Sequence, residues 1–217
     1  MKYARRILQY LNGTENFTLT YKSNSKDTIA YVDASFTPDL KTCKSVTGYL
    51  IQHSGDTISW GTKKQNMITT SSTAAEYVAI AKTLPEISLI RYLHGEIYHV
   101  ENPIHIMEEN ISTKVIAETG ERRRLRHVII KYYAVQEAVG NRDIILKSIK
   151  GTNQYADALT KAVDPEVLKK FLTFIFQCSF VTLFFYFLFL FTLIISIFSF
   201  FSVLFVIMIT IRIREGC

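Results

Sequence analysis

Four acidic residues stand at comparable places along this chain, each at or near the end of an expected strand or helix. Asp33 lies within the run Ile29–Phe36, whose β-branched and aromatic residues are typical of a half-buried strand. Glu76 lies in the expected first turn of a helix, Glu109 just past an expected strand, and Asp157 at the expected start of the last helix. If those ends converge in the folded chain, the four carboxylates share one pocket.

Carboxylates that share a pocket predict a site for divalent cations, because like charges that close repel one another unless a cation joins them. Mg²⁺ and Mn²⁺ prefer hard oxygen ligands of this kind. Two such ions about 4 Å apart can activate a water molecule and stabilise the leaving oxygen during phosphodiester cleavage. The spacing alone leaves two other interpretations open: Asp33 as a solvated acid on an edge strand, and Glu76 as an acid placed by the helix dipole.

The elements that must position these acids follow from the hydrophobic pattern. A short amphipathic helix is expected at 3–11 and a strand at 17–21. Three strand-like runs follow at 29–36, 47–52 and 57–61, and the short Gly-containing segment between the last two indicates a hairpin. Three consecutive antiparallel strands are the natural inference.

A helix is expected after these strands. Ser71-Ser-Thr73-Ala-Ala-Glu76 contains a capping-box pattern between Thr73 and Glu76. Pro85 is expected to bend or divide this helix, which would end near Gly95.

The remaining expected elements alternate between strands and helices. They are a strand at 103–107, helices at 110–118 and 127–139, a strand at 143–149 and a last helix beginning at 155–160. The order predicts an α/β fold, a mixed sheet of three antiparallel strands and then parallel strands, with helices on its faces.

Composition sets broad limits on function. Lys and Arg number 25 against 19 for Asp and Glu, so the formal charge of +6 permits an anionic partner without requiring one. The three cysteines, Cys43, Cys178 and Cys217, are far apart and form no CxxC pair. That spacing argues against a zinc knuckle and a disulfide framework, and favours a reducing, intracellular setting.

Several motifs give the chain a specific family likeness. It resembles the RNase H region of the polyproteins of copia-type LTR retrotransposons. The motifs occur in that family's order over roughly residues 1–165. They are Arg6–Thr14, Tyr31–Ala34, Lys44–Tyr49, Ile58–Gln65, Ser71–Tyr77, Glu109–Asn110, Arg126–His127 and Gln154–Lys161.

The resemblance implies an RNase H-like fold and metal-dependent cutting of the RNA strand of an RNA–DNA hybrid with two Mg²⁺ or Mn²⁺ ions. It implies that Asp33 is the shared metal ligand, that Glu76 binds near the attacking water, and that Asp157 binds the second ion. The family's remaining position is normally Asp followed by Asn, whereas this chain has Glu109-Asn110. The extra methylene moves the carboxylate by about 1 Å, and such misplacement can cost about a hundredfold in rate.

Other departures from the family support an alternative, a degraded remnant that keeps the fold without the activity. The usual acidic and Trp pair is replaced by Ser35-Phe36, and the acid expected two residues after His127 is Ile129. Ala74 also stands where an acid is common.

Basic residues provide candidate contacts to nucleic acid. Lys63, Lys64, Arg122, Arg123 and Arg124 could contact phosphates, although a solvated charge run is an equally open interpretation. The expected partner is an RNA–DNA hybrid, with a reverse transcriptase from elsewhere as a further possible partner.

The end of the chain differs from the rest, because residues 171–211 contain no charged residue. About 20 apolar residues cross a bilayer, so this stretch is either a membrane anchor, expected as an apolar helix, or the translation of AT-rich DNA. We therefore expect a reverse transcriptase remnant at 1–24, an RNase H-like domain at 25–165 and an apolar tail at 166–217. The expected location is the cytoplasm or nucleus, or a membrane if the tail is expressed.

Overall fold

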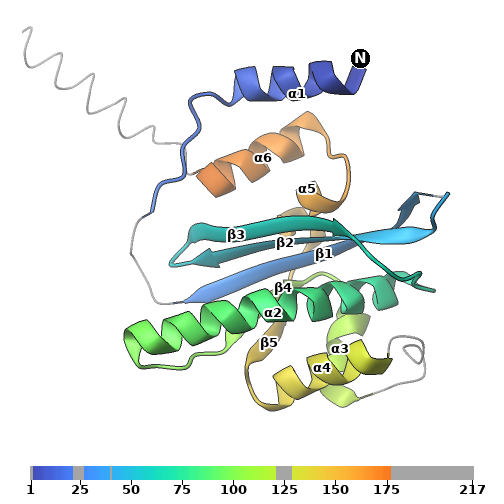
Figure 1. The fold of residues 1–217 in the computed structure, drawn as a ribbon, viewed down its shortest axis with the longest axis vertical. Helices are drawn as coiled ribbons and strands as arrows, with labels where there is room; N and C mark the ends of the chain where they lie inside the picture. Colours follow the sequence, from blue (N-terminus) through green and yellow to red (C-terminus); the bar gives the residue numbers. More distant parts are fainter. Residues whose placement is uncertain (1, 22–26, 40, 121–128, 177–217) are drawn as a thin grey trace, which may run out of the picture. The chain divides into compact units, whose positions relative to one another are not determined.

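A computed structural model describes residues 2–21, 27–39, 41–120 and 129–176. Its centre is a five-stranded sheet in the order β3-β2-β1-β4-β5 (Figure 1). The strands are β1 (Thr28–Asp39), β2 (Lys44–His53), β3 (Asp56–Lys64), β4 (Ile104–Glu108) and β5 (Ile144–Ser148). β1, β2 and β3 pair antiparallel, whereas β4 pairs parallel to both β1 and β5. The expected mixed sheet is confirmed.

Helices cover both faces of this sheet (Figure 1). One face is covered by α2 (Ser72–Tyr98), α3 (Ile111–Thr119) and α4 (Ile129–Gly140), and the other by α5 (Asp157–Thr160) and α6 (Pro165–Phe176). α1 (Lys2–Gly13) precedes the sheet, and the short 3₁₀ helix η2 (Gly151–Asn153) follows β5. β1 lies in the middle of the sheet, so side chains on both of its faces meet other elements.

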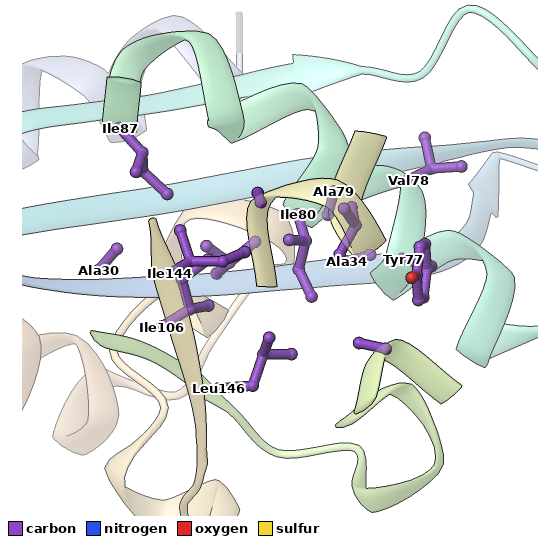
Figure 2. Close-up of a cluster of buried hydrophobic side chains, with 14 of the residues drawn as sticks. Ala30, Ala34, Tyr77, Val78, Ala79, Ile80, Ile87, Ile106, Ile144 and Leu146 are labelled. Atoms are coloured by element: carbon purple, nitrogen blue, oxygen red, sulfur yellow. The ribbon is translucent and has the colours of Figure 1, made fainter. Parts of the chain in front are cut away.

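The main core lies between the sheet and α2, α3 and α4. Ala30 and Val32 of β1 pack there with Ile80 of α2, Ile106 of β4 and Ile144 of β5, and all five are almost completely buried. Figure 2 shows the side chains of this cluster. Burial of each aliphatic side chain contributes about 1.5–3 kcal/mol, so this layer fixes the orientation of β1 and α2, which carry Asp33 and Glu76.

A second apolar cluster lies on the opposite face. Leu50 of β2 packs with Phe171, Leu172 and Ile175 of α6. The expected apolar tail began at residue 166, and the first part of that stretch therefore forms a helix seated on the sheet. Residues Met1–Gln177 make up one compact unit.

The rest of the expected tail lies outside the described residues. Among the helices of the described ranges, none combines the length and the apolarity needed to cross a bilayer. Of the expected apolar stretch 171–211, residues 171–176 lie in the described part of the chain, where they form the end of α6.

Local expectations differed from the structure in two places. Residues 17–21 form no strand, and Phe17 and Leu19 instead pack against the cluster formed by Leu50 and α6. α2 runs without interruption past Pro85, which is exposed, and ends at Tyr98. The helix has 27 residues and ends three residues after Gly95, where the sequence predicted its end.

Candidate acidic site

Asp33 lies in the central strand and is 6% exposed. Its carboxylate accepts a short hydrogen bond from the Thr160 hydroxyl of α5, and the charge of Asp157 helps to raise its pKa. Two acids separated by 124 positions in the sequence thus lie near each other. The fold brings Asp33 and Asp157 together, as the sequence predicted.

The contact depends on a close approach between β2 and α5. Gly48 pairs with Asp33 across the β1–β2 ladder. A Cβ built on Gly48 would lie 2.6 Å from the Thr160 Cγ2 and 3.0 Å from the Leu159 Cβ. Only glycine leaves room for α5 to settle this close to the sheet.

Gln154 clamps the strand ends next to this contact. Its side-chain amide donates to the Val32 carbonyl of β1 at 2.9 Å and to the Met107 carbonyl of β4 at 3.2 Å. Its carbonyl oxygen accepts from the Ala156 amide at 3.3 Å. The buried side chain therefore links two parallel strands to the segment that carries Asp157 and acts as a positioning residue.

Glu76 approaches the same place from α2. The helix is capped by the Ser71 side chain, which accepts from the Ala74 amide at 3.1 Å, so the expected Thr73 cap is wrong. Glu76 is consequently the fifth residue of α2 and lies beyond its first turn, where a helix dipole has little effect. The Ala34 backbone amide, next to Asp33, donates a hydrogen bond to the Glu76 carboxylate.

Gln65 holds the start of α2 against the sheet. Its side-chain amide donates to the Ala75 carbonyl at 2.9 Å and to the Thr47 hydroxyl of β2 at 3.1 Å. The turn before Glu76 is thereby tied to the strand that pairs with β1.

The two acids at the end of β4 have opposite surroundings. Glu108 is 1% exposed, whereas Glu109 is exposed and its carboxylate lies over Gly151. Glu109, predicted as the fourth site residue, is exposed and lies near Lys161, which pairs with Asp157, whereas its neighbour Glu108 is the buried one. Burial alternates along β4, with Ile104, Ile106 and Glu108 on the same face.

Burial and mutual repulsion alter the protonation of these acids. Burial raises the pKa of Asp33 to about 6, with a further contribution from Asp157. Burial and the Glu108 and Asp33 charges raise the pKa of Glu76 to about 10. Burial also raises the pKa of Glu108 to about 8, and the charge of Asp33 adds to that effect. The four side chains form one electrostatically coupled acidic cluster: Asp33, Glu76, Glu108 and Asp157.

Lys161 supplies positive charge beside this cluster. Its Nζ lies 2.8 Å from the Asp157 Oδ2. Although burial lowers the pKa of Lys161, the bond to Asp157 and the charges of Asp33 and Glu109 outweigh it and raise the pKa. The ammonium group therefore remains charged next to the acids.

The chemistry of the acidic cluster fits divalent cations. Within the described ranges, three of its buried oxygens, Glu76 Oε2, Glu108 Oε2 and Asp157 Oδ1, have no hydrogen-bond partner. Buried carboxylate oxygens without partners are costly, and a hard cation satisfies them. As the side chains stand, no group of three or more Asp, Glu, His or Cys in the described part of the chain is arranged to hold a metal ion, so binding requires side-chain adjustment.

The predicted basic contacts are partly described. Lys63 and Lys64 are exposed at the end of β3, and the Lys82 Nζ of α2 donates to the Lys64 carbonyl at 3.3 Å. Burial and the charges of Lys131 and Lys63 lower the pKa of Lys82, so these groups lie close together. We call Lys63, Lys64, Lys82 and Lys131 the lysine surface. Arg122, Arg123 and Arg124 lie outside the described residues.

Sequence reasoning missed the roles of three residues. Gln154 and Thr160 lie within a motif that the resemblance identified, but nothing in the pattern predicts what they contact. Glu108 had a readable signal, because it continues the alternation of Ile104 and Ile106 along one face of a strand.

Comparison with known proteins identifies similar polyproteins. No family model matches the chain. The Pol polyprotein from transposon TNT 1-94 of Nicotiana tabacum is 31% identical over 158 residues, and that from transposon RE1 of Arabidopsis thaliana is 31% identical over 174 residues. These matches cover 72% and 79% of this chain but only 12% of each polyprotein.

One comparison is with a solved structure. The crystal structure of LC11-RNase H1 in complex with an RNA/DNA hybrid superposes with a TM-score of 0.49 and 15% identity, covering 62% of this chain and 94% of that one. At this level of likeness no residue role is transferred from that enzyme.

Proposed function

We propose that the RNase H-like domain of this chain cleaves the RNA strand of RNA–DNA hybrids. The premise is that the chain is a distant homologue of one region of the copia-type retrotransposon Pol polyproteins. One observation supports the activity above others, the convergence of buried, mutually repelling acids at the centre of the sheet. Burying like charges costs stability, and that cost is explained if the site binds cations.

Asp33, Glu76 and Asp157 would hold two Mg²⁺ or Mn²⁺ ions, with Glu109 as the fourth acid predicted from the sequence. When bound, such ions lower the pKa of a water and stabilise the leaving oxygen. Asp33, which accepts a hydrogen bond from Thr160 and lies near Asp157, would be the shared ligand that the family resemblance implies. Gln154 keeps β1, β4 and the Asp157 segment in fixed relation.

The lysine surface provides a contact for the nucleic acid backbone. Lys63 and Lys64 lie two strands away from Asp33, because Asp33 pairs with Gly48 and Gly48 pairs with Thr62. Neighbouring strands are about 4.8 Å apart, so the lysines lie about 10 Å across the sheet. A duplex placed over the acids would therefore reach Lys63 and Lys64 with the phosphates that lie near the cleaved bond.

A cleavage assay tests the activity. The full-length chain is incubated with a hybrid whose RNA strand is labelled, across a series of Mg²⁺ and Mn²⁺ concentrations, with EDTA as control. We expect metal-dependent cutting of the RNA strand and none in EDTA. Absence of cutting at every metal concentration would refute the proposed activity.

A second candidate function is hybrid binding without cleavage. It is favoured by the finding that the acids of the described ranges are not arranged to hold a metal ion and that Glu109 is exposed. A Glu109→Asp variant separates cleavage from binding alone. If the wild-type chain does not cut the hybrid and this variant does, drift at position 109 removed an ancestral activity. If the wild-type chain already cleaves the hybrid, this second candidate is rejected.

We also propose the origin of the flanking segments. Residues 1–24 are assigned to the end of a reverse transcriptase region, and the part of the expected tail 166–217 that follows α6 is assigned to an added segment, with an activity in the cytoplasm or nucleus. A reverse transcriptase supplied by another chain would provide the hybrid. Cell fractionation with alkaline carbonate extraction tests whether the full chain is bound to membranes.

A further inference from the structure

We propose that α1 is a surface helix that binds lipid bilayers with negatively charged headgroups. Such binding is separate from the proposed cleavage of hybrids, because α1 contributes no residue to the acidic cluster or to the lysine surface. Three features of α1 support it: an uncovered apolar face, a polar face with positive charge only, and the way in which these two faces meet.

The apolar face of α1 is uncovered. Because an α-helix turns by about 100° per residue, Ile7, Leu8 and Leu11 lie on one side of α1. These residues are 60%, 67% and 56% exposed. No residue of α1 belongs to either apolar cluster of the described chain. The fold therefore leaves three large aliphatic side chains of one helix in water.

The C-terminal end of α1 is held without using this face. The Thr14 hydroxyl donates to the Tyr10 carbonyl at 2.8 Å, and the Thr14 amide donates to the Leu11 carbonyl at 3.3 Å. Both carbonyls are among the last four of the helix, which have no partner within it. The local hydrogen bonds thus leave the aliphatic side chains available to an external partner.

The polar face of α1 carries positive charge only. The helix contains Lys2, Arg5 and Arg6 and no Asp or Glu, and both arginines are exposed. At helical spacing Arg5 borders the apolar face on the side of Leu8. Arg6 borders it on the opposite side, next to Tyr10. Arginines in such positions can lay their stems on apolar surface while their charge stays in water, and Tyr is typical of the boundary between hydrocarbon and water.

This combination favours a lipid surface over a second copy of the chain. α1 has 12 residues and is therefore about 18 Å long. A contact between two helices of this length is small beside the roughly 1,200–2,000 Å² of a stable protein interface, and it would bring like charges together. A bilayer with anionic headgroups instead takes up the apolar face and attracts the arginines on both of its sides.

The fluorescence of a Trp placed on α1 tests this binding in the full-length chain. Trp60, the single Trp of the sequence, is removed by Trp60→Phe, and Tyr10→Trp sets a probe at the edge of the apolar face. With phosphatidylcholine vesicles that contain roughly 30% phosphatidylserine, an anionic lipid, we expect the emission to shift to shorter wavelength. With phosphatidylcholine alone the partition constant should be at least about tenfold lower, because each cation near an anionic surface contributes about fivefold.

Two double variants of this probe protein separate the contributions of the two faces. Arg5→Gln with Arg6→Gln should lower the partition constant about thirtyfold, at about fivefold for each cation. Ile7→Gln with Leu11→Gln should lower it about tenfold or more, because less apolar surface leaves water on binding. Gln is well tolerated in an exposed helix. The matched control is Ile130→Gln in α4, where the Ile is 83% exposed, and it should leave the partition constant unchanged.

Thermal unfolding and circular dichroism check that the variants fold, and all should keep the wild-type melting temperature because the altered residues are exposed. If a double variant loses helix, Leu8→Gln, a single change on the same face, is used in its place.

Several outcomes would overturn the proposal. They are no emission shift with either kind of vesicle, an equal shift with and without phosphatidylserine, and a loss in Ile130→Gln as large as in the α1 variants. Sedimentation equilibrium without vesicles tests the second copy. A mass that falls in the variant with Ile7→Gln and Leu11→Gln would assign the face to self-association and overturn lipid binding as well.

Discussion

Asp33 is a charged residue in the middle strand of a sheet, and its neighbours explain how it is tolerated. Thr160 donates a hydrogen bond to it, and the Lys161 ammonium lies beside its partner Asp157. These contacts offset only part of the burial, because the pKa of Asp33 still rises to about 6. At the residue scale the site is therefore a local source of instability.

That instability predicts how the metal-free protein responds to pH. A carboxyl whose pKa is raised on folding stabilises the folded state when it is protonated. The stability of the folded state is therefore fully present below about pH 4, the usual pKa of these groups. It is lost as the pH rises through about 6 for Asp33, about 8 for Glu108 and about 10 for Glu76. We expect the melting temperature in EDTA to fall from pH 5 to pH 8. Calorimetry in the presence of saturating Mg²⁺ should show a smaller decline; an identical decline would contradict cation binding at these acids.

Asp33→Asn separates activity from stability. The amide removes a proposed shared ligand and a buried charge, so we expect hydrolysis to fall by at least about a hundredfold while the melting temperature in EDTA stays the same or rises. Asp164→Asn, an exposed acid before α6, is the matched control and should change neither. An Asp33→Asn variant with full activity would exclude the acidic cluster as the catalytic site.

At the scale of elements, the acids meet because β2 and α5 touch without an intervening side chain. We expect Gly48→Ala to destabilise the domain, because the added methyl would collide with Thr160 and Leu159 and overpacking typically costs about 1–3 kcal/mol. The same shift displaces Asp157 from Asp33 and should reduce hybrid cleavage. Urea unfolding measures the first effect.

Gly13→Ala in α1 is the control for that substitution, since a Cβ there would meet nothing within 4 Å. Equal stability of Gly48→Ala and Gly13→Ala would show that the β2–α5 contact is looser than described.

The lysine surface joins β3, α2 and α4 and predicts a salt-dependent interaction. The double variant Lys82→Gln and Lys131→Gln should bind an RNA–DNA hybrid more weakly than wild type. The plot of log binding constant against log salt concentration should also become less steep, by about 0.9 for each phosphate that the variant no longer neutralises. Filter binding at several salt concentrations measures both. Lys147→Gln, an exposed residue on the opposite edge strand, should leave the slope unchanged; equal effects would indicate non-local charge attraction.

At the scale of the whole molecule, α6 closes the sheet face that carries Leu50. Removal of residues 165–217 exposes Leu50 and deletes Phe171, Leu172 and Ile175, and the burial of these four side chains contributes roughly 6–12 kcal/mol. That is comparable with the total stability of a small domain. We expect residues 1–176 to unfold cooperatively and 1–164 to lose cooperative unfolding, as measured by circular dichroism. Cooperative unfolding of both would show that α6 is dispensable.

The sequence by itself determined the order of the five strands of the sheet and of the helices between them, and the antiparallel start and parallel end of the sheet. Its expectation that Asp33, Glu76 and Asp157 belong to one site came from the family resemblance. These follow from local periodicity, turn residues and a family motif, all of which are written in short stretches of chain. The tertiary structure alone decided which acid at the end of β4 turns inward, where α2 begins and ends, and that Gln154, Thr160 and Gly48 hold the site together. Those choices depend on contacts between residues up to 127 positions apart, and such contacts leave no periodic signal in the sequence because each is made once.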